Sequence, residues 1–270
     1  MQAEHKSGAV PDSLKILAVG NSFSQDCMRY LWDLLRRGGI RSVTLGNLYE
    51  PGCSLARHLE LATGGAPVRT YEKNTTGEWE IRDGICLREG IADEDWDFIT
   101  FQQTSRTSGL AESYGETLTR LLDVTQALDP RAKFVWNMTW AYQSDSTHKS
   151  FPAYDNDQLK MYRMTVDCVR RCIAPEKRFI RVIPTGTAIQ NARTSFLGDT
   201  LTRDGYHLNR EIGRLIAGLT WFCTFTGLPA EVPAYDPVPD SITPRMLRMA
   251  EEAVDNAIRT PDEVTPSAFS

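Results

Sequence analysis

The sequence predicts an α/β fold, a three-layer α/β/α sandwich in which helices cover both faces of a parallel sheet. Two observations carry this prediction: short stretches rich in apolar and β-branched residues recur along the chain, and amphipathic helical patterns separate them. The β-rich stretches are LKILAVG (14–20), RSVTLGNLY (41–49), WDFITFQ (96–102), AKFVWNMT (132–139) and RFIRVIP (178–184). We therefore expect a five-stranded parallel sheet.

Helical patterns fill the intervals between these strands. Apolar residues at a spacing of three and four mark residues 27–39, 114–129 and 159–172, and the first of these ends at a glycine pair, as helix C-termini often do. A further long helix is expected at about residues 210–225. A proline-rich stretch and a short amphipathic helix follow it.

One domain accounts for most of the 270 residues. We expect it to span residues 14–258, with flexible ends at residues 1–13 and 259–270. Turn signals at Thr76-Gly77 and Asp83-Gly84 predict a small β-hairpin, inserted beside the sheet at about residues 67–88.

Charge and hydropathy exclude several classes of partner. The chain has 30 basic and 35 acidic residues and no long cluster of lysine and arginine, so nucleic acid is not expected to bind. The longest apolar run, LIAGLTWFCTF, has 11 residues, whereas crossing a bilayer takes about 20.

Residues 1–13 lack the apolar core of a signal peptide, although an exported protein could have lost one, so both the cytoplasm and an exported location stay open. The oligomeric state stays open too.

No cofactor or metal is expected. The six cysteines fit no metal-binding spacing, and we expect buried free thiols rather than disulfides. The chain also lacks the Gly-x-Gly-x-x-Gly turn of dinucleotide-binding proteins, the phosphate-binding P-loop and the Gly-x-Ser-x-Gly elbow of the α/β-hydrolases.

Ser22 lies where the first strand runs into a helix, in ILAVGNSFSQD (16–26). Such a sheet binds its ligand beyond the carboxyl ends of the strands, so Ser22 is placed to act as a nucleophile. The alternative is structural: Ser22 followed by Gln25 matches a helix capping box, in which the hydroxyl only caps the helix.

A second cluster, LTRDGYHLNREIG (201–213), follows the fifth strand and contains Asp204 and His207. A serine nucleophile needs a base that accepts its proton, and the base needs a carboxylate that orients it. The ends of the first and fifth strands share one rim of the sheet, so His207 is placed to reach Ser22. Alternatively, His207 is a surface histidine and Asp204 a turn residue beside Gly205.

These residues carry a resemblance. GNSFS and DGYHLN resemble the first and last blocks of the SGNH (GDSL-like) hydrolase superfamily, and the chain resembles the DUF4886 branch of it over roughly residues 14–228. The stretches involved are VGNSFSQD, LYEPGCSLARHL, WDFITFQQTS, MTWAY, IPTGTAIQNARTS and LTRDGYHLN. The resemblance implies the flavodoxin-like SGNH hydrolase fold. Two departures stand out: Asn21 replaces the usual Asp, and no Gly-x-Asn-Asp block is present.

The resemblance implies a catalytic triad. Ser22 is then the nucleophile, His207 the general base and later the acid, and Asp204 the orienting carboxylate. It also implies an oxyanion hole, formed by the backbone N–H of Ser22, by Gly52 and by a carboxamide from Gln102, with Gln103 as the alternative. Without the resemblance, the Pro-Gly pair at Gly52 is equally typical of a plain turn.

Contacts to substrate are assigned more loosely. Asn21 adjoins the nucleophile, and Trp140 and Tyr142 follow the fourth strand, where they could form an aromatic wall for a sugar or belong to the core. His58 lies on a helical pattern and is expected at the surface.

The sequence thus indicates a cofactor-independent serine esterase. Relatives in the superfamily that remove acetyl groups from carbohydrates make a short acyl ester on a glycan the expected substrate. The same triad could serve an acyltransferase, thioesterase or lipase. A non-catalytic carbohydrate-binding or scaffold protein on this fold is the alternative from another class.

Overall fold

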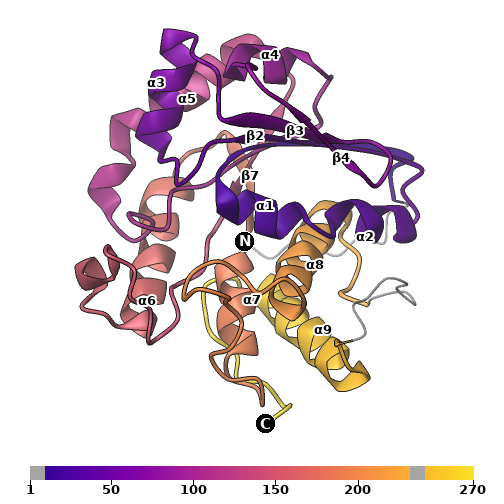
Figure 1. Ribbon diagram of the computed structural model, residues 1–270, viewed down its shortest axis with the longest axis vertical. Helices are drawn as coiled ribbons and strands as arrows, with labels where there is room; N and C mark the ends of the chain where they lie inside the picture. Colours follow the sequence, from indigo (N-terminus) through magenta and orange to yellow (C-terminus); the bar gives the residue numbers. More distant parts are fainter. Residues whose placement is uncertain (1–9, 232–240) are drawn as a thin grey trace.

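The computed structural model describes residues 10–231 and 241–270 (Figure 1). In these residues the strands form one sheet in the order β4-β3-β2-β1-β5-β6-β7. Strands β2, β1, β5, β6 and β7 run parallel and coincide with the five expected stretches. Their bounds are β1 Ser13–Gly20, β2 Ser42–Tyr49, β5 Phe98–Phe101, β6 Lys133–Asn137 and β7 Phe179–Ile183. The predicted α/β fold is confirmed, and the order of its parallel strands is flavodoxin-like.

The expected hairpin is present, but it extends the sheet instead of lying beside it. It consists of β3 (Thr70–Asn74) and β4 (Trp79–Arg82), and β3 pairs antiparallel with β2. Its turn contains Gly77, which has a φ of +103° and donates its N–H to Asn74 Oδ1 at 2.8 Å. The described sheet therefore has seven strands where five were expected, because the hairpin was expected apart from the sheet and its polar strands carry little apolar pattern.

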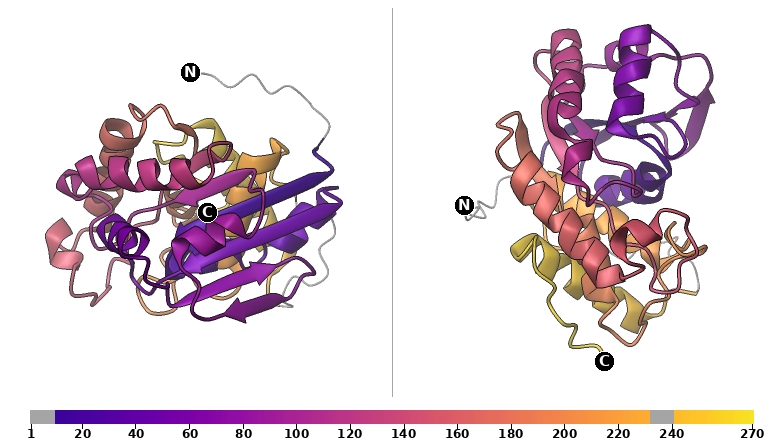
Figure 2. Two further views of the ribbon diagram at one scale, coloured as in Figure 1. Left: turned by 90° about the horizontal axis from the view of Figure 1, so that it is seen from above. Right: turned by 90° about the vertical axis from the view of Figure 1, so that its left-hand side faces the viewer.

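Helices cover both faces of this sheet (Figures 1 and 2). One layer contains α1 (Ser22–Met28), α2 (Leu31–Arg37), α7 (Thr185–Ala192), α8 (Ile212–Thr226) and α9 (Pro244–Arg259). The other contains α3 (Leu55–Gly64), α4 (Leu87–Ala92), α5 (Gly115–Leu128) and α6 (Gln158–Cys168). Side chains of β1 alternate between the layers: Ile16 and Ala18 pack in the first core, Leu17 and Val19 in the second.

The helix expected at residues 27–39 is divided in two. Helix α1 begins five residues earlier, at Ser22, and α2 follows it after a break at Arg29 and Tyr30. Helix α6 continues into a π-helical turn, Val169–Ile173. Two short 3₁₀ turns, Ala111–Ser113 and Phe151–Tyr154, lie in the loops after β5 and β6.

Helix α8 brings the site together. Its sequence is apolar on nearly every side, and it is buried among α1, α2, α7 and α9. Because α8 packs against α1, the loop that precedes α8 meets the start of α1, where Ser22 lies. The fold thus places residues 201–211 beside a residue almost two hundred positions earlier.

The described helices are all too short or too polar to traverse a lipid bilayer. The six cysteines are free thiols, and burial raises the pKa of Cys27, Cys53 and Cys223. These thiols are packed as small apolar side chains.

Candidate active site

Ser22 is the first residue of α1, just beyond the carboxyl end of β1. The residue before it, Asn21, caps the helix: its side-chain oxygen accepts the Phe23 N–H at 3.0 Å, and its carbonyl accepts the Gln25 N–H at 3.3 Å. The interpretation of Ser22 as the capping side chain is therefore wrong. Its hydroxyl is left for another partner.

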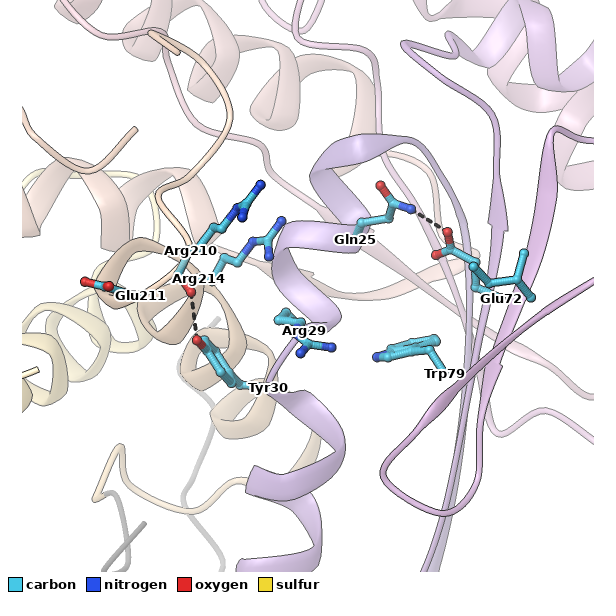
Figure 3. Close-up of a pocket in the computed structure, with 9 residues that line it drawn as sticks. Gln25, Arg29, Tyr30, Glu72, Trp79, Arg210, Glu211 and Arg214 are labelled. Carbon is cyan, nitrogen blue, oxygen red and sulfur yellow. Dashed lines mark hydrogen bonds between the residues drawn. The ribbon is translucent and has the colours of Figure 1, made fainter. Parts of the chain in front are cut away.

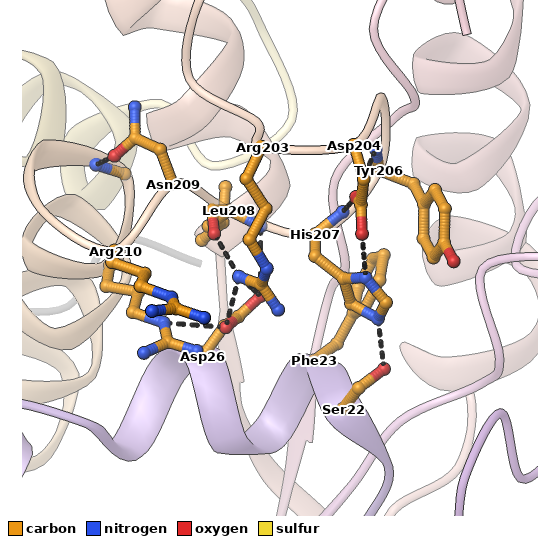
Figure 4. Close-up of polar contacts among 12 residues, drawn as sticks. Ser22, Phe23, Asp26, Arg203, Asp204, Tyr206, His207, Leu208, Asn209 and Arg210 are labelled. Carbon is orange, nitrogen blue, oxygen red and sulfur yellow. Dashed lines mark hydrogen bonds and ion pairs between the residues drawn. The ribbon is translucent and has the colours of Figure 1, made fainter.

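That partner is His207. Its Nε2 lies 2.8 Å from Ser22 Oγ, and its Nδ1 lies 2.6 Å from Asp204 Oδ2, so the three side chains stand in line (Figure 4). With Nδ1–H donating to the carboxylate, Nε2 is the acceptor for the Ser22 hydroxyl proton. The structure brings together the three residues that the sequence singled out.

The Asp204 carboxylate is held in its charged form. Burial by itself would raise the pKa of Asp204. Hydrogen bonds from the His207 ring and from the backbone N–H groups of His207 (2.8 Å) and Tyr206 (3.3 Å) outweigh burial, and the pKa of this carboxyl is lowered. A charged carboxylate at Nδ1 fixes the imidazole tautomer and favours the imidazolium.

The resemblance assigns two backbone N–H groups, those of Ser22 and Gly52, to an oxyanion hole. In the described part of the chain, neither the Ser22 nor the Gly52 N–H donates a hydrogen bond. Ser22 occupies the first turn of α1, where unpaired N–H groups favour an anion. Gly52 lies in the loop after β2 with a φ of +58°, and Asn21 Nδ2 ties that loop to the start of α1 by donating to Cys53 O at 3.0 Å.

Of the two glutamines, only Gln102 reaches the residues around Ser22. Its Nε2 donates to Asn21 Oδ1 at 2.8 Å. Gln103 instead ties its loop to the start of α3, since it accepts the Leu55 N–H at 3.1 Å, and it donates to Ser113 O at 2.9 Å. The two side chains point to opposite faces, as adjacent residues at a strand end do.

The chain matches a family model over nearly its whole length. Residues 15–257 match the model described as "Domain of unknown function (DUF4886)". The chain belongs to the DUF4886 family. Its structure is also similar to the crystal structure of a DUF4886 family protein from Bacteroides uniformis, with 40% sequence identity, a TM-score of 0.89, and coverage of 94% of this chain and 98% of that one.

A more distant likeness concerns the fold alone. A carbohydrate esterase family 3 structure from Talaromyces cellulolyticus shares 12% sequence identity with a TM-score of 0.51, over 77% of this chain and 94% of that one. The SGNH hydrolase fold expected from the resemblance is thereby confirmed for this DUF4886 protein. No curated protein matches the chain.

In this DUF4886 protein, Asp26 joins α1 to the triad loop. The carboxylate is fully buried and accepts the backbone N–H of Leu208 at 2.9 Å (Figure 4). It also pairs with Arg214 Nε at 2.7 Å and Arg203 Nη1 at 3.1 Å. Both ends of the loop that carries His207 are thus tied to the helix that carries Ser22. Nothing in the sequence pattern singled out this carboxylate.

Trp140 and Tyr142 pack in the core and do not line the site. Both are fully buried. Trp140 stacks on Phe23 with ring centroids 4.0 Å apart and donates its indole N–H to Tyr206 O at 2.7 Å. Asn21 is also buried, with both polar atoms of its side chain engaged, so it supports the turn before Ser22. Trp140 and Asn21 therefore support the segments that carry the triad residues, and for Trp140 and Tyr142 the core alternative holds.

His58 is buried, not exposed as expected. Its exposed fraction is 1%, and its Nε2 lies 3.1 Å from the carbonyl oxygen of Gly20, two residues before Ser22. Burial lowers the pKa of His58 to about 4, so the ring is neutral and Nε2–H is the donor. This contact links α3 to the end of β1.

A chain of buried amides supports the Asn21 turn from beneath. Gln102 Oε1 accepts from Asn137 Nδ2 at 2.9 Å, and Asn137 Oδ1 accepts from Thr185 Oγ1 at 2.7 Å. The network therefore runs from the turn at Ser22 through the ends of β5 and β6 to α7. Asn137 was not predicted from the sequence, because only the sheet order shows that its strand adjoins Gln102.

Half-buried aromatic rings lie beside His207, and a cation lies beside Gly52. The Tyr206 ring lies 4.2 Å from the His207 ring and 4.8 Å from the His148 ring. A Cβ built on Gly52 would lie 3.0 Å from Arg106 Nη2, so this exposed guanidinium packs against the loop after β2. Within residues 10–231 and 241–270, no three His, Cys, Asp or Glu side chains gather as metal ligands would.

Proposed function

We propose that this DUF4886 protein is a serine esterase that removes short acyl groups, acetyl in particular, from carbohydrate esters. The observation that carries the proposal is the alignment of Ser22, His207 and Asp204 at 2.8 Å and 2.6 Å. A buried structural role would not require this order of groups, whereas acyl transfer does.

The first half-reaction acylates the serine. Ser22 Oγ attacks the ester carbonyl carbon while His207 Nε2 takes the hydroxyl proton. The carbonyl oxygen becomes an oxyanion, and we assign its stabilisation to the N–H groups of Ser22 and Gly52. When the tetrahedral intermediate collapses, His207 returns the proton to the departing sugar oxygen, and an acyl-Ser22 ester remains.

The second half-reaction restores the enzyme. Water attacks the acyl carbon and gives its proton to His207, and the acid leaves as the proton passes back to Ser22 Oγ. Asp204 keeps its charge throughout and stabilises the imidazolium in both steps.

The substrate class is proposed from two supports. The likeness in fold to the carbohydrate esterase family 3 structure favours an ester on a sugar. The packing of Tyr206 against His207 leaves an aromatic ring beside the reacting atoms, suited to a sugar ring or a small acyl group.

Hydrolysis of p-nitrophenyl acetate tests the proposal, with Ser22→Ala as the variant and Ser42→Ala as the matched control. Ser42 is an exposed serine at the opposite, amino end of β2. We expect Ser42→Ala to match the wild-type chain and Ser22→Ala to lose about 10³-fold or more in rate. Equal rates for Ser22→Ala and wild type would favour a non-catalytic carbohydrate-binding or scaffold protein.

Acetate release from acetylated glycans then tests the substrate class. We expect the wild-type chain to deacetylate an acetylated polysaccharide faster than a long-chain lipid ester or an acyl thioester. The reverse preference would point to a lipase or thioesterase that uses the same triad.

A further inference from the structure

A pocket of about 590 Å³ lies between α1, the β3–β4 hairpin and the start of α8 (Figure 3). The triad residues do not line this pocket, but Gln25 of α1 and Arg29, just after its end, do. Ser22, Gln25 and Arg29 lie at positions i, i+3 and i+7, and therefore on one stripe of the helix. With the helical rise of 1.5 Å per residue, Arg29 lies about 10 Å along α1 from Ser22. A ligand that reaches both places must be longer than a simple acyl ester.

The pocket contains two arginines that form no ion pair with the described residues. Arg29 and Arg210 are exposed and line the pocket, and neither forms an ion pair with a described residue. A third arginine, Arg214, is already bound to Asp26 through Nε. The planar guanidinium fork of arginine matches a carboxylate, so two such groups without acidic partners suit an anionic ligand.

The acidic residues of the pocket form no ion pair with these two arginines. Glu72 accepts hydrogen bonds from the Gln25 amide and, at 2.9 Å, from Asn47 Nδ2, and burial raises its pKa. Its oxygens are therefore engaged by the protein. Glu211 is exposed and forms no ion pair with Arg29 or Arg210 among the described residues. Figure 3 shows Arg210 and Arg214 on the opposite side of α1 from Glu72.

An aromatic side chain forms another part of the wall. Trp79 of β4 lines the pocket, is partly exposed, and lies beside Arg29 in Figure 3. The C–H face of a sugar ring packs on an indole, whose surface is broad and apolar. Cations together with an indole suit a sugar that carries a carboxylate better than a neutral sugar or a free inorganic anion.

We propose that this pocket binds a carboxylate-bearing sugar unit of the glycan whose ester is cleaved at Ser22, so that the substrate is an acidic polysaccharide. The assignment of the substrate rests on the proposed esterase function. The binding step does not, because it requires no reaction at Ser22.

Binding of unacetylated oligosaccharides to the wild-type chain tests the proposal. Isothermal titration calorimetry compares an oligogalacturonate with a neutral manno-oligosaccharide of the same length. We expect the oligogalacturonate to bind at least about 10-fold more tightly, and its affinity to fall as salt is added while that of the neutral chain does not. Equal affinity, or no binding of the oligogalacturonate, would overturn the proposal.

Variants locate the site. The double variant Arg29→Gln/Arg210→Gln should bind the oligogalacturonate about 10-fold more weakly, whereas Arg88→Gln, an exposed arginine on α4 outside the pocket, should bind it as the wild type does. A thermal melt checks that each variant is folded. The salt titration uses the wild-type chain alone, so it tests the proposal even if a variant does not fold. Unchanged affinity in the double variant would refute the assignment.

Failure of esterase activity with p-nitrophenyl acetate would leave this binding result standing, so the two proposals fail separately.

Discussion

Asp26 accepts the backbone N–H of Leu208 at 2.9 Å, one turn along α1 from the serine that meets His207. Ser22 and Asp26 lie four residues apart and therefore on one face of the helix. Their partners are consecutive residues of the triad loop. The position of His207 relative to Ser22 is thus fixed by a second, buried contact, from Asp26 to Leu208, beside the first.

This contact predicts that Asp26→Asn reduces both stability and activity. Loss of one partner of a buried ion pair costs about 3–5 kcal/mol, and we expect about 2–3 kcal/mol here because Arg203 and Arg214 are partly exposed. Urea unfolding measures this loss. The kcat for p-nitrophenyl acetate should fall at least about 10-fold, because His207 loses its register. Asp83→Asn, an exposed carboxylate on the hairpin, is the control. Unchanged kcat in a destabilised but folded Asp26→Asn would show that Asp26 has only a structural role.

Asp204→Asn should lower kcat by about 10³–10⁴-fold, because an amide no longer fixes the tautomer of His207.

The same variant tests the lowered pKa of Asp204. A carboxyl whose pKa is lower in the folded than in the unfolded protein contributes stability above its unfolded value, near 3.9, and loses it as the pH falls further. The difference in unfolding free energy between wild type and Asp204→Asn should be constant from pH 7 to about 5 and shrink below about 4. A difference that grows on acidification would contradict this.

Gly52→Ala tests the oxyanion loop against a matched glycine. An alanine at positive φ costs about 1–2 kcal/mol of stability, both at Gly52 and at the control position Gly65. At Gly52 the added Cβ also meets Arg106 Nη2 at 3.0 Å, whereas nothing lies within 4 Å at Gly65. We expect similar losses of thermal stability in the two variants, but a loss of kcat of about 10-fold or more only in Gly52→Ala. Equal kcat values would remove Gly52 from the proposed oxyanion hole.

The burial of His58 predicts a second pH dependence of the unfolding free energy, caused by loss of solvation and not by hydrogen bonds. Burial lowers its pKa to about 4, whereas a histidine in the unfolded chain titrates near 6.5. Between these values the unfolded state binds a proton that the folded state does not, so the contribution of His58 to stability falls as the pH falls. Relative to His58→Gln, whose amide can still donate to Gly20 O, wild type should lose about 1.4 kcal/mol per pH unit between pH 6.5 and 4. Parallel pH curves for the two proteins would mean that His58 is not held neutral.

The sequence predicts the parallel strands and the approach of the triad residues for a general reason. Parallel strands end at one rim, so residues that follow β1 and precede α8 can be placed together without knowledge of side-chain packing. The side chains that hold the triad in place could not be predicted from the sequence in this way. Asp26 lies on a helix face whose partners come from residues 203–214, and no local pattern signals a buried carboxylate between two arginines.

Local patterns also mislead where burial depends on distant elements. His58 occupies a helical position that would be exposed if the helix stood alone, but α3 packs its ring against the end of β1. Trp140 follows a strand end, where aromatics can face a ligand or the core, and only the neighbouring Phe23 ring decides for the core. The polar strands of the hairpin join the sheet because β2 leaves an edge free to pair.

The most direct test of the account is the site of acylation. The wild-type chain is mixed with p-nitrophenyl acetate, quenched in acid within one turnover, digested and analysed by peptide mass spectrometry. We predict a single acetylated peptide, modified at Ser22, that is absent from Ser22→Ala. Undiminished hydrolysis by Ser22→Ala, with no acetyl group found at Ser22 in the wild type, would contradict the account.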